Sequence, residues 1–292
     1  MERLYDKSVY GKLPQLVEWA LKVVPERVFV AEEHGEILSS AYSMVCGYDN
    51  LWSSYLAFRE EESARRLIDY LLKIRSKKGL RNLYVFCPKD FVDIRVHLIS
   101  RGFVPECIRN IDDKDYIVEL HDGAFNPACH LSKPLKPLSD KLREGKSDDV
   151  QALAGILHES LPRDFNTIED AVKCARRWLD EMCEYTIVAE HKGKPVGVLL
   201  ISSEIHPVLD RKMAMLCYIA VDKQFRGRGI GKALVEEAYR VLRKKGKRSM
   251  EVDVSVHNIQ ARIFYTKAGF YPFWLSKNYM PHDNGIFYRI DF

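Results

Sequence analysis

Two stretches of this chain carry the same landmarks in the same order, and this repeat constrains the fold more than any other feature. Each stretch has a hairpin-like segment, an apolar strand, a glycine and then a Gly-Phe pair. The Gly-Phe pair ends 24 residues after the glycine in both stretches. The matching segments are 30–35 with 188–193, 55–58 with 218–221, Gly79 with Gly246, and Phe103 with Phe270. We therefore interpret the 292-residue chain as a tandem repeat of one α+β unit, with a period of roughly 160 residues.

Hydrophobic periodicity places the elements of each unit. In the second unit we expect helices at 148–161, 167–183, from the glycines near 230 to 245, and 258–268, with strands at 185–190, 195–204, 212–221, 250–255, 271–275 and 286–291. In the first we expect a helix after Pro14, strands at 27–32, 37–46, 53–58 and 83–87, a helix at 60–78, a short helix ending at Arg101 and two closing strands.

The stretch between the units contains Pro127, Pro134 and Pro137 and shows no clear periodicity. We expect a first domain at 1–125, a linker at 126–138 and a second domain at 139–292. The end of this stretch is a candidate for the first strand of the second unit.

Composition excludes several classes of protein. The chain has 45 Lys and Arg against 41 Asp and Glu, and a net charge of +4 is too small to indicate a nucleic-acid-binding protein. We see no apolar run long enough for a membrane span and no signal-peptide pattern. The seven cysteines form no Cys-x-x-Cys motif and no metal-spaced pattern with the nine histidines. We expect a cytoplasmic protein with free thiols and no metal.

The segment from Val221 to Leu234 reads Val-Asp-Lys-Gln-Phe-Arg-Gly-Arg-Gly-Ile-Gly-Lys-Ala-Leu. It ends an apolar strand, passes through a basic, glycine-rich turn and enters an amphipathic helix. A helix N-terminus presents unpaired N–H groups at the positive end of the helix dipole, and glycines let the backbone approach phosphate oxygens closely. The segment predicts a diphosphate-binding site. The alternative is a glycine-rich surface turn with solvated cations.

With a second motif, this turn resembles the GNAT superfamily of N-acetyltransferases. Arg226-x-x-Gly229-x-Gly231 fits the family pattern Gln/Arg-x-x-Gly-x-Gly/Ala between strand and helix. Asn258-x-x-Ala261-x-x-Phe264-Tyr265-x-x-x-Gly269-Phe270 fits the family's helix that ends in Gly-Phe. The resemblance is strong over residues 139–292. The first unit resembles the family only through the repeat. Together, the resemblance and the repeat imply two tandem GNAT-like units, each a mixed, mostly antiparallel, twisted sheet flanked by helices.

The resemblance implies acetyl-CoA as co-substrate. The pantetheine arm would lie along the strand before the turn, the next strand would splay away at Val252–Val254, and Asn258 would bond the arm or cap its helix. Lys267 and Arg262 either lie near the adenosine phosphate or are solvated helix residues. The expected coenzyme-binding residues are Ile219, Ala220, Val221, Arg226, Gly227, Arg228, Gly229, Ile230, Gly231, Lys232 and Asn258.

The implied reaction is direct attack of a neutral amine on the thioester. A backbone N–H near Val221 would stabilise the carbonyl oxygen, and Tyr265 would protonate the departing thiolate. The alternative for Tyr265 is an aromatic core residue. No general base stands out, because the strand before the turn offers only Met215 and Cys217 at its inward positions. The open alternatives are a water chain or a side chain from Glu204, His206, Glu251 and Asp253.

The first unit lacks these features. Arg59-Glu-Glu-Glu-Ser-Ala64 stands where the second unit has its glycine-rich turn, and three glutamates there would repel a pyrophosphate. Leu98 stands opposite Tyr265, and Phe91 opposite Asn258. We expect the first unit to keep the fold, to bind no coenzyme, and to pack against the second.

The acceptor stays open: a small-molecule amine or a protein amino group. A donor other than acetyl-CoA, or a non-catalytic acyl-CoA sensor, are the alternative functions. We expect no nucleic-acid partner, no membrane association, and a monomer or homodimer.

Overall fold

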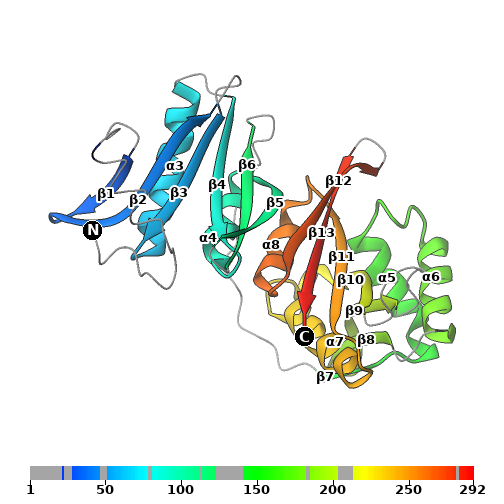
Figure 1. The fold of residues 1–292 in the computed structure, drawn as a ribbon. Coiled ribbons are helices and arrows are strands. Elements are labelled where there is room, and N and C mark those ends of the chain that lie inside the picture. The colour runs from blue at the N-terminus through cyan, green and yellow to red at the C-terminus, as the bar shows by residue number, and fades with distance from the viewer. Residues whose placement is uncertain are drawn as a thin grey trace. The chain divides into compact units, whose positions relative to one another are not determined.

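A computed structural model describes residues 22, 28–46, 51–77, 81–111, 114–122, 141–181, 185–202, 213–280 and 283–292. The chain forms two compact units. One comprises Met1–His130 and Asp253–Tyr288, and the other comprises Leu131–Val252 and Arg289–Phe292. Figure 1 shows the elements in both. Residues 253–288 therefore pack with the N-terminal part, although they lie near the other end of the sequence.

The N-terminal part holds a six-stranded sheet of order β1-β2-β3-β4-β6-β5. Only the central pair β3–β4 is parallel, and the other neighbours are antiparallel. The strands are β1 (Val28–Glu33), β2 (Glu36–Cys46), β3 (Leu51–Phe58), β4 (Asn82–Pro88), β5 (Val104–Ile111) and β6 (Lys114–His121).

Two helices cover this sheet, α3 (Glu61–Lys77) and α4 (Val92–Ser100). Helix α3 is amphipathic, and it buries Ala64, Leu67, Ile68 and Leu71. These side chains pack with residues of β2, β3, β4 and α4 and with Phe103 in one hydrophobic core. Burial of this apolar face provides the main driving force for the fold of this part.

The second sheet has seven strands in the order β12-β13-β11-β10-β9-β8-β7. The pair β10–β11 is parallel, and β7, β8, β9 and β10 pair antiparallel with one another in turn. The strands are β7 (Lys141–Glu144), β8 (Thr186–His191), β9 (Lys194–Ser202), β10 (Met213–Val221), β11 (Ser249–Ser255), β12 (Tyr271–Met280) and β13 (Asp283–Asp291).

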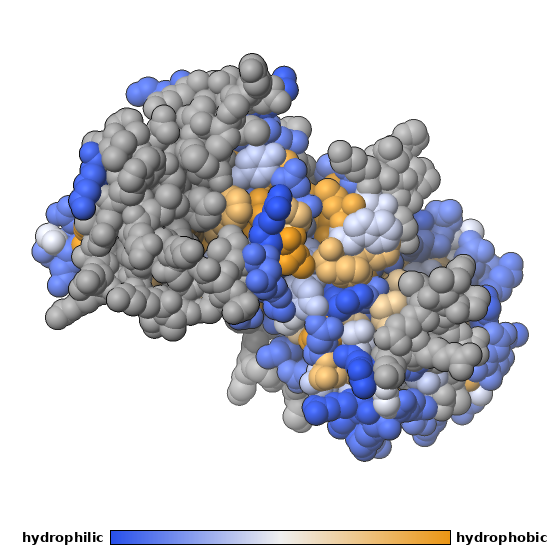
Figure 2. Space-filling view, in the orientation of Figure 1, coloured by the Kyte–Doolittle hydropathy of each residue, from blue (hydrophilic) through white to orange (hydrophobic). Residues whose placement is uncertain are grey.

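Four α-helices accompany this sheet: α5 (Val150–Ser160), α6 (Ile168–Glu181), α7 (Ile230–Lys244) and α8 (Ile259–Lys267). Helices α5 and α6 pack their apolar faces with β8, β9 and β10 in a second core. Helix α6 buries only Ala171, Ala175 and Leu179. Figure 2 accordingly shows hydrophilic residues over the side where α6 lies.

The predicted elements are confirmed throughout the described ranges, with ends that shift by a few residues. The expected extra strand after the linker is β7, at Lys141–Glu144. The largest differences are in β12 and β13, which extend to form a longer hairpin than predicted. The helix expected after Pro14, the linker at 126–138 and the end of the strand at 203–204 lie outside the described residues.

The two sheets share one strand order. Reading β1-β2-β3-β4-β6-β5 against β8-β9-β10-β11-β13-β12 matches every strand, and β7 is an addition at one edge. The hairpins β1–β2 and β8–β9 also turn alike, since His34-Gly35 and Lys192-Gly193 all have positive φ. This agreement supports the tandem-repeat interpretation, which stays a prediction together with its domain boundaries.

A glycine in β9 lets helix α7 lie close to the sheet. A Cβ atom built on Gly197 would come within 3.1 Å of Ile230 Cγ2 and 3.3 Å of Leu234 Cδ1, both on α7, and 3.4 Å of the Ala220 carbonyl oxygen. The two contacts with α7 would be too short for ordinary packing. A side chain at 197 would therefore require Ile230, Leu234 or helix α7 itself to shift.

We expect Gly197→Val to lower the free energy of unfolding by about 1–3 kcal/mol, because it overpacks this contact. Gly155→Ala, in helix α5, is the matched control. A Cβ there meets no atom within 4 Å, and alanine favours helix by about 1 kcal/mol over glycine. Thermal unfolding of both variants checks this, and equal melting temperatures would contradict it.

Candidate functional site

Strand β10 is only partly paired on the side of β11. Its antiparallel ladder with β9 runs from Met215 to Val221, whereas its parallel ladder with β11 runs only from Met213 to Met215. The parallel ladder ends with the pair Met215–Glu251. The second half of β10 therefore has backbone edge outside that ladder, which agrees with the splayed strand that the sequence predicts.

The turn after β10 depends on glycine conformations. Asp222 begins it by capping the short 3-10 helix η4 (Lys223–Phe225), and its carboxylate accepts a hydrogen bond from the Gln224 N–H at 2.9 Å. Gly227 and Gly229 then adopt φ values of 75° and 87°, in the left-handed region that favours glycine. The two glycines direct the chain from the strand end into α7.

The N-terminus of α7 is open to an anion. Its N-cap residue is Gly229, which has no side chain to bond the first N–H groups, and the first turn contains no acidic residue. A Cβ atom at Gly229 would meet nothing within 4 Å. The first N–H groups of a helix have no acceptor within it and lie at its positive end. This geometry is suited to binding a phosphate group.

The three expected cations of the turn differ in their surroundings. Arg226 Nε donates to the Val221 carbonyl oxygen at 2.9 Å, and its Nη2 donates to Ser160 Oγ at 2.9 Å. Arg228 is half-buried. Lys232 is exposed, and its Nζ lies 3.6 Å from the Glu236 carboxylate. The Arg226 guanidinium thus holds the end of β10, a role that its sequence motif does not reveal.

Ser160 is a further residue that sequence reasoning missed. It is the last residue of α5 and lies beside the end of β10, with Oγ 3.4 Å from the Val221 carbonyl oxygen. It is 66 residues from Arg226 in sequence, and no local pattern could connect the two. Only the packing of α5 against β10 brings them together.

Helix α8 begins and ends as its motif predicts. Asn258 is the N-cap, and its Oδ1 accepts a hydrogen bond from the Ala261 N–H at 3.1 Å. Gly269 has a φ of 94°, and the Phe270 N–H donates to the Tyr265 carbonyl oxygen at 2.9 Å. The helix-cap interpretation of Asn258 is confirmed, while its contact with a coenzyme stays a prediction.

Tyr265 is a buried aromatic residue, 6% exposed. Its ring lies 5.4 Å from that of Phe270 and 6.2 Å from that of Tyr288, between centroids. Burial raises the pKa of Tyr265 above its ordinary value, and the negative charge of Asp253 raises it further. The phenol therefore keeps its proton at neutral pH, so it is both a core residue and a protonated group.

The candidate bases differ in their surroundings. Met215 and Cys217 are half-buried, and neither side chain is a good base. Glu251 is buried, at 5% exposed, and accepts a hydrogen bond from Arg289 Nε at 2.7 Å. The hydrogen bond to arginine occupies this carboxylate. Glu204 and His206 lie outside the described residues.

One expectation for α8 is wrong. The sequence predicts Arg262 in solvent or near a phosphate, but it is 0% exposed. Its Nη1 donates to the Val256 carbonyl oxygen at 3.0 Å, and its Nη2 donates to that of Phe103 at 2.6 Å. The helical pattern does not reveal this, because a buried arginine is rare unless its donors are bonded. Lys267 is exposed, as expected.

In the N-terminal part, the residues that align with the glycine-rich turn, Asn258 and Tyr265 differ from them in chemistry. Glu61 and Glu62 occupy the first turn of α3, where they form ion pairs with Arg65. At the start of α4, Phe91 supplies no side-chain cap, and Leu98 in that helix is completely buried. These carboxylates already complement the dipole of α3.

No cluster of His, Cys, Asp and Glu that could hold a metal ion occurs within the described ranges. Among the helices that the structure describes, none is both long and apolar enough to cross a membrane.

Comparison with known proteins identifies part of the chain. Residues 150–270 match the acetyltransferase (GNAT) family, so the chain carries a GNAT-family acetyltransferase domain there. The match includes β10, the glycine-rich turn, α7 and the whole of α8.

Individual relatives are similar over shorter stretches. An uncharacterized N-acetyltransferase of Methanocaldococcus jannaschii is 42% identical over 84 residues, which are 28% of this chain and 37% of the relative. N-alpha-acetyltransferase 30 of Schizosaccharomyces pombe is 27% identical over 97 residues, which are 32% of this chain and 63% of the relative. Both matches cover less than two thirds of the relative's length.

Among solved structures, Ard1 from Thermoplasma volcanium superposes with a TM-score of 0.45 at 24% identity, over 53% of this chain and 98% of that one.

We expect Asn258→Ala to destabilise the protein by about 1 kcal/mol, because it leaves the first turn of α8 without its side-chain cap. Asn258→Asp keeps the acceptor oxygen and adds a charge that suits a helix N-terminus, so it should be nearly neutral. Urea unfolding of both variants measures the difference. Equal midpoints for Asn258→Ala and the unaltered protein would show that the cap has no energetic role.

Proposed function

We propose that this chain, with its GNAT-family domain at residues 150–270, transfers an acetyl group from acetyl-CoA to a primary amine. The observation that carries the proposal is the uncapped, acid-free N-terminus of α7 behind two left-handed glycines. Coenzyme A carries a pyrophosphate, and a helix start of this kind favours that group.

In this proposal the backbone of the turn from Gly227 to Gly231 binds the pyrophosphate, and Lys232 adds positive charge from the first turn of α7. The pantetheine arm bonds the edge of β10 at Ile219–Val221, in the manner of an added strand. The early end of the β10–β11 ladder supports this, because it leaves backbone edge for the arm. Arg226 contributes by holding the Val221 carbonyl and thereby the end of the strand.

The chemistry follows from the groups available. A neutral amine attacks the thioester carbon, a backbone N–H near Val221 stabilises the developing oxyanion, and the C–S bond breaks as the amide forms. The amine loses one proton, and the thiolate gains one from the Tyr265 hydroxyl, which carries its proton at neutral pH. Water carries the amine's proton away and returns a proton to the Tyr265 phenolate, since the Glu251 carboxylate is paired with Arg289.

We further propose that residues 1–125 form a GNAT-like domain that does not bind the coenzyme, joined by a linker at 126–138 to a catalytic domain at 139–292. The shared strand order of the two sheets supports a tandem fold. The acidic first turn of α3 supports the loss of phosphate binding. Soaking crystals with coenzyme A, or titrating the protein with it, tests this proposal. Coenzyme bound in the first domain, or a second binding site per chain, would overturn it.

The acceptor is an amine that is either a small molecule or a protein amino group. The Schizosaccharomyces pombe relative is named an N-alpha-acetyltransferase, which supports a protein N-terminus as one candidate. A donor with another acyl group fits the turn equally well, because the turn faces the pyrophosphate. A second candidate function is a sensor that binds acyl-CoA without transferring the acyl group. The pairing of Glu251 with Arg289 favours it, because that carboxylate is then not free to act as a base.

An amine and peptide library offered with acetyl-CoA separates these functions. A transferase releases free thiol in proportion to acylated product, whereas a sensor binds the coenzyme and releases none. Offering propionyl-CoA in parallel identifies the preferred acyl group. Stoichiometric binding with no thiol release from any amine would contradict the enzymatic proposal.

We expect Lys232→Glu to weaken coenzyme A binding about tenfold or more, since it places a carboxylate at the phosphate-binding helix start. Lys244→Glu makes the same charge change in the last turn of α7 and should leave the affinity nearly unchanged. Calorimetric titration at two salt concentrations measures both, and the Lys232 effect should shrink at high salt. Equal affinities for the two variants would remove the helix start from the binding site.

We expect Tyr265→Phe to reduce kcat by roughly 10²–10⁴-fold while coenzyme affinity is kept, because it removes the proton donor. Tyr288→Phe is the control. Tyr288 is also fully buried, and its hydroxyl has no hydrogen-bond partner among the described residues, so its loss should change neither kcat nor stability appreciably. A Tyr265→Phe enzyme with normal turnover would exclude Tyr265 from catalysis.

A further inference from the structure

Arg262 joins two segments that are far apart in the sequence. It lies in α8 and is completely buried, and its two terminal nitrogens bond different carbonyl oxygens. One belongs to Val256, just before the helix cap, and the other to Phe103, which is 159 residues away and lies just after α4. The planar fork of a guanidinium can make two such bonds in fixed directions, and an ammonium group cannot.

Arg262 lies beside an apolar contact between helices α4 and α8. Val96 and Ile99 of α4 pack with Ile259 and Ile263 of α8, and all four are buried. These helices belong to the same compact unit. The Arg262 bond to Phe103 therefore lies beside an apolar contact that excludes water, where a hydrogen bond from a charged donor is strongest.

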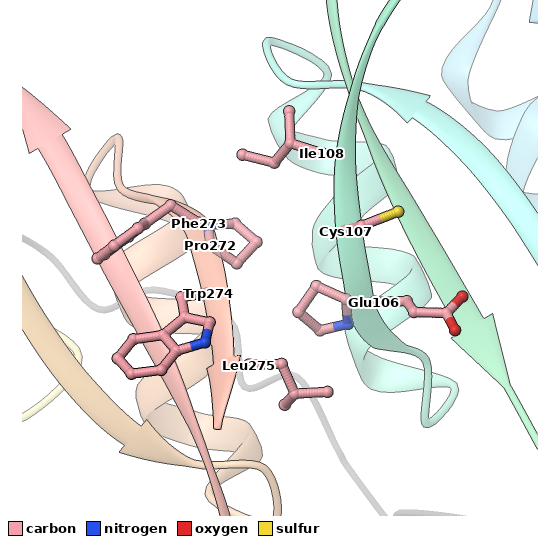
Figure 3. A pocket seen from close by; sticks show the side chains of 8 residues that line it. Glu106, Cys107, Ile108, Pro272, Phe273, Trp274 and Leu275 are labelled. Carbon is pink, nitrogen blue, oxygen red and sulfur yellow. The ribbon is translucent and has the colours of Figure 1, made fainter. Parts of the chain in front are cut away.

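The same two segments meet again at the sheet edges. Strands β5 and β12 are neighbours, and Figure 3 shows the pocket between them. Ile108 and Pro272 point toward the gap, whereas the Glu106 carboxylate points away from it. Most of the residues that line this pocket are apolar. Among these contacts, the two hydrogen bonds of the Arg262 guanidinium have a fixed direction.

Arg95 provides an internal comparison. It occupies the position in α4 that corresponds to Arg262 in α8, and it is 1% exposed. Its Nη1 donates to the Lys89 carbonyl oxygen at 3.2 Å, the local bond that corresponds to Arg262 with Val256. Its Nη2, however, has no hydrogen-bond partner in the part of the chain that the structure describes. Of this pair, Arg262 is the one that reaches across to the other segment.

The charges near this contact are partly balanced. Glu119 of β6 is 1% exposed, and both arginines act electrostatically on its carboxyl group. Burial nevertheless raises the pKa of Glu119, because desolvation exceeds the effect of the two cations. The guanidinium of Arg262 has two carbonyl acceptors, and its buried Nε has no hydrogen-bond partner among the described residues.

We infer that Arg262 is a positioning residue that fastens α8 to the end of α4 through the Phe103 carbonyl. Helix α8 carries Asn258 at its start and Tyr265 one turn after Arg262, so the bond sets where both residues lie. The catalytic consequence rests on the function proposed above. The N-terminal segment then has a specific role, because it holds the helix that carries the proton donor.

Hydrogen–deuterium exchange on the full chain tests the mechanical part without reference to activity. In Arg262→Met, which keeps the bulk but removes the donors, we expect the amides of α8 to exchange about tenfold faster or more. The amides of α7 should be unaffected. In the matched Arg95→Met variant, we expect faster exchange mainly in α4. Wild-type protection of α8 in Arg262→Met would overturn the inference.

Arg262→Lys keeps the inference testable if the methionine variant does not fold. It retains the charge and one bond at most, so α8 should again exchange faster than in the wild type. Unchanged protection of α8 in this variant would also overturn the inference.

A double-mutant cycle with Tyr265→Phe tests the catalytic part. If Arg262 acts through Tyr265, Arg262→Lys lowers kcat in the wild-type background but causes no further loss in Tyr265→Phe. Losses that multiply would show that Arg262 does not act through Tyr265. If the wild type shows no transfer at all, the proposed function fails, and the exchange data alone decide whether α8 is fastened by Arg262.

Discussion

The position of the glycine-rich turn depends on one close contact at Gly197. This residue pairs with Val221, the last residue of β10, and its Cα faces Ile230, the first residue of α7. The missing side chain therefore sets the distance between the end of the strand and the start of the helix. The turn must span that distance, and two glycines with positive φ do so. The backbone geometry proposed for phosphate binding follows from this packing.

Two helices that follow equivalent central strands start with opposite chemistry. Helix α7 begins with an uncapped glycine and no acid, while α3 begins with glutamates paired to nearby arginines. Both solutions are stable, because a helix N-terminus is satisfied by its own carboxylates or left to a bound anion. The difference supports assigning the coenzyme to one part of the chain and a structural role to the other.

Helix α8 combines stability with the proposed chemistry. Its N-cap, its aromatic packing and the bonds of Arg262 are structural features that hold irrespective of function. Tyr265 is buried in this helix, and burial together with the charge of Asp253 raises the pKa of its hydroxyl. A proton donor held by packing and hydrogen bonds has little freedom to move, which is what positioning for catalysis requires.

Local sequence determined the elements and the turn. Periodicity and glycine placement were sufficient for the strands, the helices and the caps at Asn258 and Gly269, because these depend on neighbours within a few residues. The tertiary structure alone decided the partners of long polar side chains. The sequence predicts Arg262 in solvent or near a phosphate and places Glu251 among the candidate bases. It does not reveal that Arg262 bonds Phe103, that Glu251 bonds Arg289 or that Arg226 bonds Ser160, because only folding brings these residues together. A long flexible side chain can reach many partners, and only packing selects one of them.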